Sequence, residues 1–157
     1  MMVEVYVVGL SMDPQTNQFV VLLKEKKEGK RILPIWIGPF EANAIAVAIE
    51  KIDIGRPLTH DLIKNILEVL NVKVDKVFIH SLKENTFYAT IYLISNDKVF
   101  EIDSRPSDAM ALALRTDSPI FVDSQILENA GFIEEYSAEE ELTKLLQELN
   151  PEEFKKQ

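Results

Sequence analysis

The sequence predicts an α+β fold built from an internally duplicated unit of three strands and a helix. Alternating, strand-like segments precede each of two Ala-rich helical stretches, and each of these stretches has a proline near its start. A shift of 67 positions, which moves residue 35 onto residue 102, superimposes the two stretches. The shift matches five identities, namely Ile35, Pro39, Ala42, Ala44 and Ala46 with Ile102, Pro106, Ala109, Ala111 and Ala113.

The first half contains strand patterns followed by two helical patterns. A charged turn that contains Gly29 separates two apolar segments, as expected of a strand pair. Pro39 suits the first turn of a helix, and Thr59 is the expected N-cap of the next helix. The expected elements are one strand over 3–10, two strands within 19–37, and helices over 38–52 and 59–71.

The second half repeats this order and adds a short strand and a short helix. Alternate alanines place small residues on every side of the two central helices, with larger aliphatic residues between them. Such helices are typically buried, so we expect them to cover mixed or antiparallel sheets. The expected elements are strands over 72–82, 86–95 and 98–103, a helix over 105–115, and a short strand and helix within 118–132.

These patterns predict one domain over residues 1–133, followed by an appendage over 134–157. The first repeat covers about 2–71 and the second about 72–133. The appendage is an acidic segment that opens with a capping box of Ser137 and Glu140. Its leucines form one apolar stripe, as in an amphipathic helix: Leu142, Leu145, Leu146 and Leu149.

Composition restricts the possible functions. The chain has 157 residues, of which 46% are hydrophobic, and it contains no cysteine. Disulfides, cysteine-ligated metals and thiol nucleophiles are therefore excluded. No apolar run approaches the roughly 20 residues of a membrane span, and no basic leader precedes an apolar stretch, so we expect a cytoplasmic protein with no membrane partner. The net charge of -9 opposes binding to a phosphate backbone unless a local basic patch or divalent cations assist.

A dense polar segment, "DSRPSD" (103–108), leads directly into the second Ala-rich helix. Helix capping accounts for Ser104, Ser107 and Asp108, because such residues satisfy free backbone N–H groups and complement the helix dipole. Capping does not account for Arg105, since a cation is mildly unfavourable at a helix N-terminus. We therefore expect Arg105 either to pair with a carboxylate such as Asp103 or Asp108, or to form an anion site with free N–H groups.

A second polar cluster, "GRPLTHDL" (55–62), contains Arg56, His60 and Asp61. His60 is a candidate general acid or base, or a metal ligand, in the first turn of a helix. It is one of two histidines, and the other, His80, falls in a strand pattern. His60 and Asp61 are adjacent and point about 100° apart, so they do not form a dyad with each other. A solvated or capping histidine is the simpler alternative.

Four carboxylates would converge if the two repeats pack about a pseudo-twofold axis, because they lie near helix N-termini. Grouped acids bind Mg²⁺ or Mn²⁺ through oxygen, and metal-assisted phosphodiester hydrolysis is the chemistry that such a site would serve. No organic cofactor is expected. The candidate metal ligands are Glu41, Asp61, Asp103 and Asp108.

Three segments, "LPIWIGPFEANAIA", "RPLTHDL" and "DSRPSDAMALALR", resemble the signature segments of the bifunctional nuclease domain family. The resemblance covers roughly residues 2–133. It implies an α+β domain with an internal repeat, a homodimer or higher oligomer, and a nuclease that acts on both RNA and DNA. No established catalytic mechanism comes with it. The positions carried over are Asp103, Arg105 and Asp108, with Glu41, and Arg56, His60 and Asp61.

Two functions of different classes fit these observations. The first is a divalent-metal nuclease in which Arg105 or Arg56 contacts the scissile phosphate and His60 transfers a proton. The second is a non-catalytic oligomeric module in which the Arg-Pro motifs are structural joints. Exposure distinguishes them, because a site requires Arg105 and Asp103 to line a reachable cleft, whereas a joint buries them in a closed ion pair.

Overall fold

The computed structural model describes residues 1–27 and 29–133. They form an α+β fold with one eight-stranded mixed sheet and four helices. The predicted C-terminal helix therefore lies outside the described residues. The strands are β1 (Met2–Asp13), β2 (Gln18–Glu25), β3 (Arg31–Ile37), β4 (Lys73–Lys83), β5 (Thr86–Ser95), β6 (Lys98–Ser104), β7 (Ile120–Asp123) and β8 (Phe132–Ile133).

The strand order across the sheet is β6-β5-β4-β7-β1-β2-β3-β8. β1–β2–β3 and β4–β5–β6 are each antiparallel and consecutive in the chain. β7 lies between the two groups, antiparallel to β1 and parallel to β4, and it joins them into one sheet. Each half thus contains three strands and then a helix, in the predicted order. The internal duplication itself stays a prediction.

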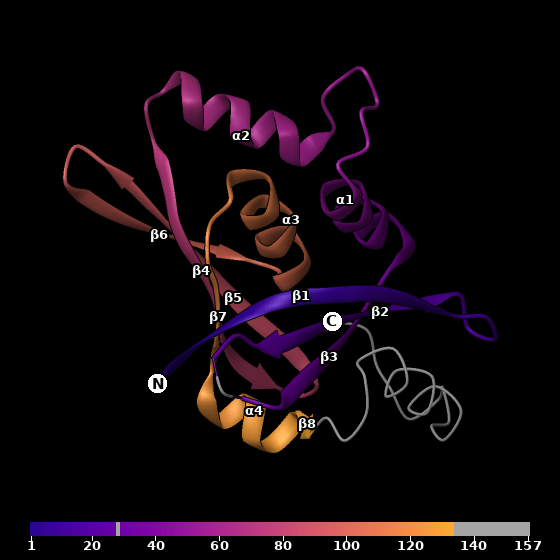
Figure 1. Cartoon of the computed structure of the whole chain (residues 1–157). Coiled ribbons are helices and arrows are strands. Elements are labelled where there is room, and N and C mark those ends of the chain that lie inside the picture. Colours follow the sequence, from indigo (N-terminus) through magenta and orange to yellow (C-terminus); the bar gives the residue numbers. More distant parts are fainter. Residues whose placement is uncertain (28, 134–157) are drawn as a thin grey trace.

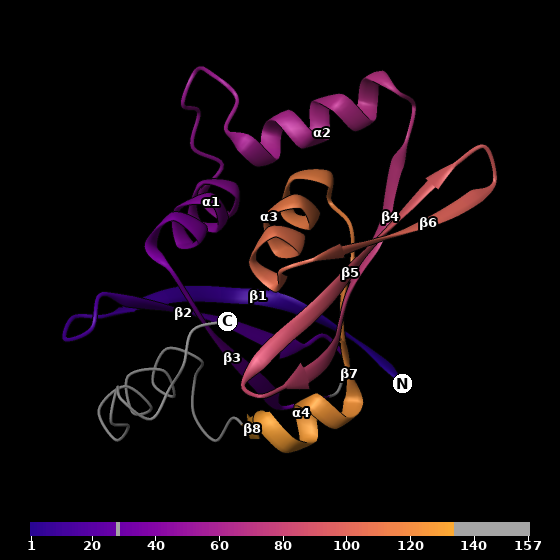
Figure 2. The same ribbon diagram turned by 180° about the vertical axis from the view of Figure 1, so that it is seen from behind.

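Four helices pack against this sheet. They are α1 (Pro39–Glu50), α2 (Thr59–Val69), α3 (Pro106–Thr116) and α4 (Ser124–Ala130). Figure 1 shows α1, α2 and α3 together, with α3 between the other two, and α4 away from them at the far end of the molecule. Figure 2 shows the same arrangement from behind, where β6 leads into the start of α3. This layout brings the N-terminal part of α3 next to both neighbouring helices.

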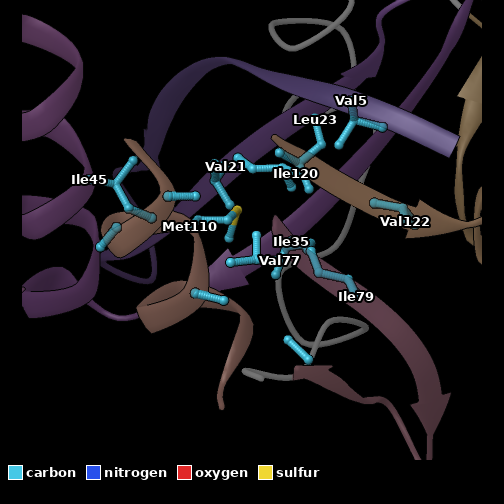
Figure 3. Packing of buried hydrophobic residues seen from close by; sticks show 14 of the residues in the cluster. Val5, Val21, Leu23, Ile35, Ile45, Val77, Ile79, Met110, Ile120 and Val122 are labelled. Carbon is cyan, nitrogen blue, oxygen red and sulfur yellow. The ribbon is translucent and has the colours of Figure 1, made fainter. Parts of the chain in front are cut away.

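The main core lies between one face of the sheet and the helices α1, α3 and α4. Met110 of α3 is fully buried and lies with Val21, Ile35 and Val77 from three strands (Figure 3). A smaller cluster of Val20, Leu22, Ile32 and Trp36 occupies the other face of the sheet. Alternate residues of a strand point to opposite faces, so β2 is buried on both. Such burial accounts for the unbroken apolar run at 19–23.

The three helices on the common face differ in how deeply they are buried. α3 is buried over most of its length, as expected, whereas α1 buries only Ala42, Ala44 and Ile45. α2 has no fully buried residue, and only its partly buried Ile63 and Leu67 pack against the core. The N-terminus of α2 is therefore positioned largely by polar contacts, which are the contacts of the candidate site. No helix in the described part of the chain is long and apolar enough to cross a membrane.

Candidate functional site

The first turns of α1, α2 and α3 are linked by four side chains that we call the His60 cluster: Glu41, His60, Arg105 and Asp108. Glu41 lies in the first turn of α1, His60 in that of α2, and Asp108 in that of α3, whose N-cap residue is Arg105. Acids in a first turn are favoured by the positive end of the helix dipole. Of the four carboxylates predicted to converge, Glu41 and Asp108 lie in this cluster, where both contact Arg105.

His60 and Asp108 form the central contact of the cluster. The Nε2 atom of His60 lies 2.9 Å from Oδ1 of Asp108, although the two residues are 48 positions apart in the chain. The His60 side chain is 12% exposed and that of Asp108 is 38% exposed. The hydrogen bond with His60 lowers the pKa of Asp108 below its ordinary value; burial opposes this effect and the charge of Arg105 adds to it. Asp108 is thus ionised at neutral pH and holds the imidazole in a fixed orientation.

Arg105 lies between two carboxylates and is still largely open to solvent. Its Nε donates to Oδ2 of Asp108 at 3.3 Å, and its NH1 donates to Oε1 of Glu41 at 3.2 Å. The charge of Asp108 raises the pKa of Arg105, and Glu41 contributes to the increase. The expectation that Arg105 pairs with a carboxylate is confirmed, with Glu41 as a second partner. Its side chain is 57% exposed, so the guanidinium is reachable by a ligand.

Helix capping, the simpler interpretation of the polar segment before α3, is only partly right: Asp108 lies in the first turn, where an acid complements the helix dipole, but no described side chain caps the free N–H groups. The N-cap position has no side-chain hydrogen bond to the helix. Both oxygens of Asp108 bond to side chains, and the hydroxyl of Ser104 donates to the carbonyl of Arg105. Ser107 is buried, and its hydroxyl has no partner among the described residues. The acid that would have capped the helix orients His60 and Arg105 instead.

A second pair of side chains, Asp61 and Arg115, joins α2 to α3 in addition to His60 and Asp108. Asp61 Oδ1 accepts from Nε of Arg115 at 2.9 Å, while NH1 of Arg115 donates to the carbonyl of Ala111. The other oxygen of Asp61 accepts from the backbone N–H of Leu58 at 2.9 Å. Burial alone raises the pKa of Asp61, but the hydrogen bonds from Leu58 and Arg115 outweigh it and lower the pKa. His60 and Asp61 form no dyad, as expected, because each has its own partner on α3.

The structure also corrects the start of α2 and adds one residue to the predicted set. The N-cap position belongs to Leu58 and not to Thr59, because Asp61 supplies the acceptor for the free N–H group there. Arg115 was missing from the predicted site residues. Its side chain is only 5% exposed, and a cation in the last turn of an otherwise buried apolar helix was the signal that it needed an acid nearby.

A cavity of about 560 Å³ opens beside the His60 cluster. One part of its lining is polar and includes His60, Arg105 and Asp108. Asp103 lines the same part from the end of β6, where it is exposed and has no hydrogen bond or ion pair within the described ranges. The rest of the lining is aliphatic. Arg105 and Asp103 thus line a reachable cavity, which is the arrangement that a site requires.

Arg56 is the predicted site residue that lies apart from the others. It is exposed in the segment between α1 and α2, and it does not line the cavity. No hydrogen bond or ion pair links it to the cluster in the part of the chain that the structure describes. The preceding Gly55 has a φ of +78°, a backbone conformation that favours glycine and turns the chain before α2.

The predicted carboxylate ligands do not fit a preformed metal site. Residues 1–27 and 29–133 contain no group of three or more His, Asp or Glu side chains arranged to hold a metal ion. Asp61 bonds to Arg115, and Asp108 bonds to Arg105 and His60, so both carboxylates already neutralise a cationic or imidazole partner. Glu41 has one buried oxygen without a partner, and Asp103 is unpaired. Each of these two offers oxygen donors, but together they are only two ligands.

Comparisons with known proteins show a family relationship. The bifunctional nuclease domain matches residues 21–135, a range that includes the whole His60 cluster. An uncharacterized protein of Mycobacterium tuberculosis is 41% identical over 152 residues, which cover 97% of this chain and 90% of that protein. Bifunctional nuclease 1 of Oryza sativa subsp. japonica is 27% identical over 114 residues, covering 71% of this chain and 34% of the rice protein.

Bifunctional nuclease 2 of Arabidopsis thaliana is 25% identical over 114 residues, which cover 71% of this chain and 35% of the plant protein. The matched segment is thus about a third of each plant relative, whereas it is nearly the whole of the mycobacterial one. The resemblance of the three sequence segments is confirmed by these matches. The chain belongs to the bifunctional nuclease domain family.

Proposed function

We propose that this protein is a nuclease that hydrolyses phosphodiester bonds in RNA and DNA at the His60 cluster. The observation that carries the proposal is an imidazole held by an ionised carboxylate, 2.9 Å away, in a cavity that it shares with an exposed arginine. These are the parts that general acid–base catalysis on a phosphate ester requires. The family membership and the names of the plant relatives support the same activity.

In this proposal Arg105 binds the scissile phosphate and His60 transfers the proton. With its Nε2 proton donated to Asp108, His60 has a lone pair on Nδ1, which accepts a proton from the attacking water. The new bond joins the water oxygen to phosphorus, and the bond from phosphorus to the leaving oxygen breaks. The leaving oxygen takes a proton from solvent. Arg105 stabilises the negative charge on the phosphate oxygens, and Asp108 stabilises the imidazolium that forms.

In this proposal the remaining predicted residues assist substrate binding and do not transfer the proton. Asp103 lines the cavity with a free carboxylate, so it can accept a hydrogen bond from the attacking water or from a sugar hydroxyl. Arg56 lies outside the cavity and is exposed, so its proposed role is to contact a neighbouring phosphate. Glu41 holds Arg105 and competes with the phosphate for it. No step here is routed through Mg²⁺ or Mn²⁺, and the metal requirement stays a prediction from the sequence.

The alternative is a non-catalytic module in which the Arg-Pro motifs, at Arg56 and Arg105, are structural joints. Side-chain exposure favours a different role for each arginine. Arg115 is 5% exposed and forms a closed pair with Asp61, as a joint would. Arg105 is 57% exposed and lines a cavity, which favours a binding role. Arg115, which belongs to neither Arg-Pro motif, is a structural joint, whereas the exposure of Arg105 favours the nuclease interpretation over the alternative.

We also propose that the protein is a homodimer or higher homo-oligomer and that α2 supplies the contact. Four apolar side chains form one exposed stripe on this helix and its end. An unpaired stripe of this kind is typical of an interface. Because two chains of charge -9 repel each other, association of two copies requires an apolar contact such as this stripe to offset the repulsion. The stripe consists of Leu62, Ile66, Val69 and Leu70, which are 53%, 49%, 85% and 64% exposed.

The test of the nuclease proposal is cleavage of labelled single-stranded RNA and DNA by the purified chain in Mg²⁺, in Mn²⁺ and in EDTA. His60→Gln is compared with His80→Gln, which changes the other histidine, a strand residue that bonds to Ser81. We expect His60→Gln to lose about 10²–10⁴-fold in rate and His80→Gln to retain the rate. Equal loss in both variants, or none in either, contradicts the assignment. The EDTA arm measures the metal requirement independently.

A further inference from the structure

The cavity beside the His60 cluster has two chemically different parts. Its polar part carries the groups assigned to phosphate chemistry, including His60, Arg105 and Asp108. Its other part is lined by aliphatic side chains from α2, α3, β5 and β6, with no charged group among them. A volume of about 560 Å³ lies in the range of about 300–1,000 Å³ typical of small-ligand sites. The aliphatic residues are Ile63, Leu67, Ile91, Leu93, Ile102 and Leu112.

Charge alone does not explain how nucleic acid would bind at this cavity. Among the described residues, Arg105 is the only Lys or Arg in the lining, and its partners Asp108 and Glu41 are both acids. Asp103 adds a third carboxylate at the same place. Most affinity for a phosphate backbone comes from several Lys or Arg contacts that release counterions. One shared arginine supplies little of this, so a neutral part of the ligand must contribute.

We propose that the aliphatic part of the cavity receives an unpaired nucleobase of the strand whose phosphate lies at Arg105. This inference rests on the proposed nuclease function and names its substrate class: single-stranded or locally unpaired RNA and DNA. A base is flat and largely apolar on its faces, and apolar side chains can enclose it once it has left the stack. In a duplex the base must first be unpaired, and the free energy that this costs makes a duplex a poorer ligand than a single strand. No amide or charged group lines the aliphatic part, so all four bases are accepted.

The test measures binding of the full chain to two fluorescein-labelled decamers in EDTA by fluorescence anisotropy. One is single-stranded decathymidylate, and the other carries abasic tetrahydrofuran sugars at every position. We expect the abasic strand to bind about tenfold more weakly or worse. We also expect a weak salt dependence. A plot of the logarithm of affinity against the logarithm of salt concentration falls by about 0.7 for each phosphate contacted, so a strand held by one arginine gives a total slope of about -0.7.

Two matched variants of β6 locate the base. Ile102 is 45% exposed and lines the cavity, whereas Val99 is 60% exposed and lies an odd number of positions away, on the opposite face of the strand. We expect Ile102→Asp to abolish the preference for the base-bearing strand and Val99→Asp to retain it. Ile102→Ser provides a milder change with the same expected direction. A preference that survives both changes at Ile102 overturns the inference.

The outcomes separate this inference from the nuclease function. Equal binding of both decamers by the unmodified chain, or cleavage of duplex as fast as single strand, overturns the base site and leaves the nuclease function intact. A preference for the base-bearing strand that Ile102→Asp abolishes, in a chain that cleaves nothing, supports the base site and rejects the nuclease function. No binding to either decamer overturns the inference.

Discussion

His60 and Asp108 connect two helices that lie far apart in the chain, with Nε2 and Oδ1 2.9 Å apart. One residue lies in the first turn of α2 and the other in the first turn of α3. The same carboxylate also accepts from Arg105, so one acid orients the proposed proton acceptor and the proposed phosphate ligand together. A change at Asp108 therefore affects both groups, whereas a change at Glu41 affects only Arg105.

Asp108→Asn is expected to reduce cleavage by about 10²-fold or more while the chain stays folded. The amide can still accept one hydrogen bond, but it is neutral and does not stabilise the imidazolium that forms at His60. The measurement is the single-turnover rate together with thermal unfolding. Asp97→Asn, in the exposed turn before β6, is the matched control and is expected to cleave like the unmodified chain. Full activity of Asp108→Asn contradicts the assigned role.

Glu41→Gln is expected to lower KM by up to about fivefold. Glu41 and a phosphate compete for Arg105, and a partly exposed ion pair of this kind is worth about 0.2–1 kcal/mol. Glu50→Gln, at the exposed end of the same helix, is the control. The predicted metal role gives the opposite result, since a lost carboxylate ligand lowers activity and raises the Mg²⁺ or Mn²⁺ concentration required. Steady-state kinetics at several metal concentrations distinguish the two.

The local elements could be predicted from the sequence, but their assembly into one sheet could not. Strand alternation and prolines in helix first turns are local signals, and they placed the strands and helices in the observed order. β7 is a short apolar run, and its parallel pairing with β4 joins residues about 40 positions apart. No local pattern encodes such a pairing. The apolar runs also do not indicate that α1 is buried on one side only.

The site was predictable to the extent that a residue conflicted with its local environment. Arg105 at a helix N-terminus required an acid, and the structure provides two. Asp108 fitted the helix start well enough to be explained as a cap, so its contact with His60 gave no local signal. Arg115 ends an alanine and leucine stretch whose pattern indicates burial of the helix and does not indicate an ion pair. The long-range contacts of a polar residue are therefore hardest to predict when its local sequence already accounts for it.

Asp61→Asn is expected to lower the free energy of unfolding by about 1–3 kcal/mol, because it leaves the nearly buried Arg115 without a charged partner. NH2 of Arg115 already has no hydrogen-bond partner in the described part of the chain, so no nearby acceptor replaces the lost carboxylate. Urea unfolding of Asp61→Asn, Arg115→Met and the double variant gives a thermodynamic cycle. We expect the double variant to be more stable than the sum of the single effects implies. Simple additivity shows that the two residues do not interact.

The double variant Leu62→Ser, Ile66→Ser is expected to convert an oligomer into a monomer with little loss of folding stability. Both side chains are about half exposed in the described part of the chain, and in this proposal a second copy buries their apolar area. Sedimentation velocity measures the mass of the particle. The double variant Ile54→Ser, Val99→Ser removes two exposed apolar side chains elsewhere and is expected to keep the oligomer. An unmodified chain that is monomeric at high concentration contradicts the proposed interface.

Acid is expected to destabilise the protein partly through Asp61 and Asp108, whose pKa values are both lowered from the ordinary value of 3.8. A lowered folded-state pKa means that the unfolded chain binds protons first as the pH falls. The stability from these groups is therefore fully present above the unfolded pKa, and it is lost as the pH falls through the lower folded pKa.

Urea unfolding between about pH 7 and pH 3 measures this acid dependence. Asp61→Asn and Asp108→Asn are less stable at neutral pH, but each is expected to lose less further stability below about pH 4 than the unmodified chain does, since each lacks one group that takes up a proton. Asp97→Asn, which changes an exposed turn residue, is expected to follow the unmodified chain. Identical slopes in all four proteins would show that neither carboxylate contributes more to the folded state than to the unfolded one. Because both acids hold the start of α2 against α3, their protonation is expected to release His60 from the cavity before the sheet unfolds.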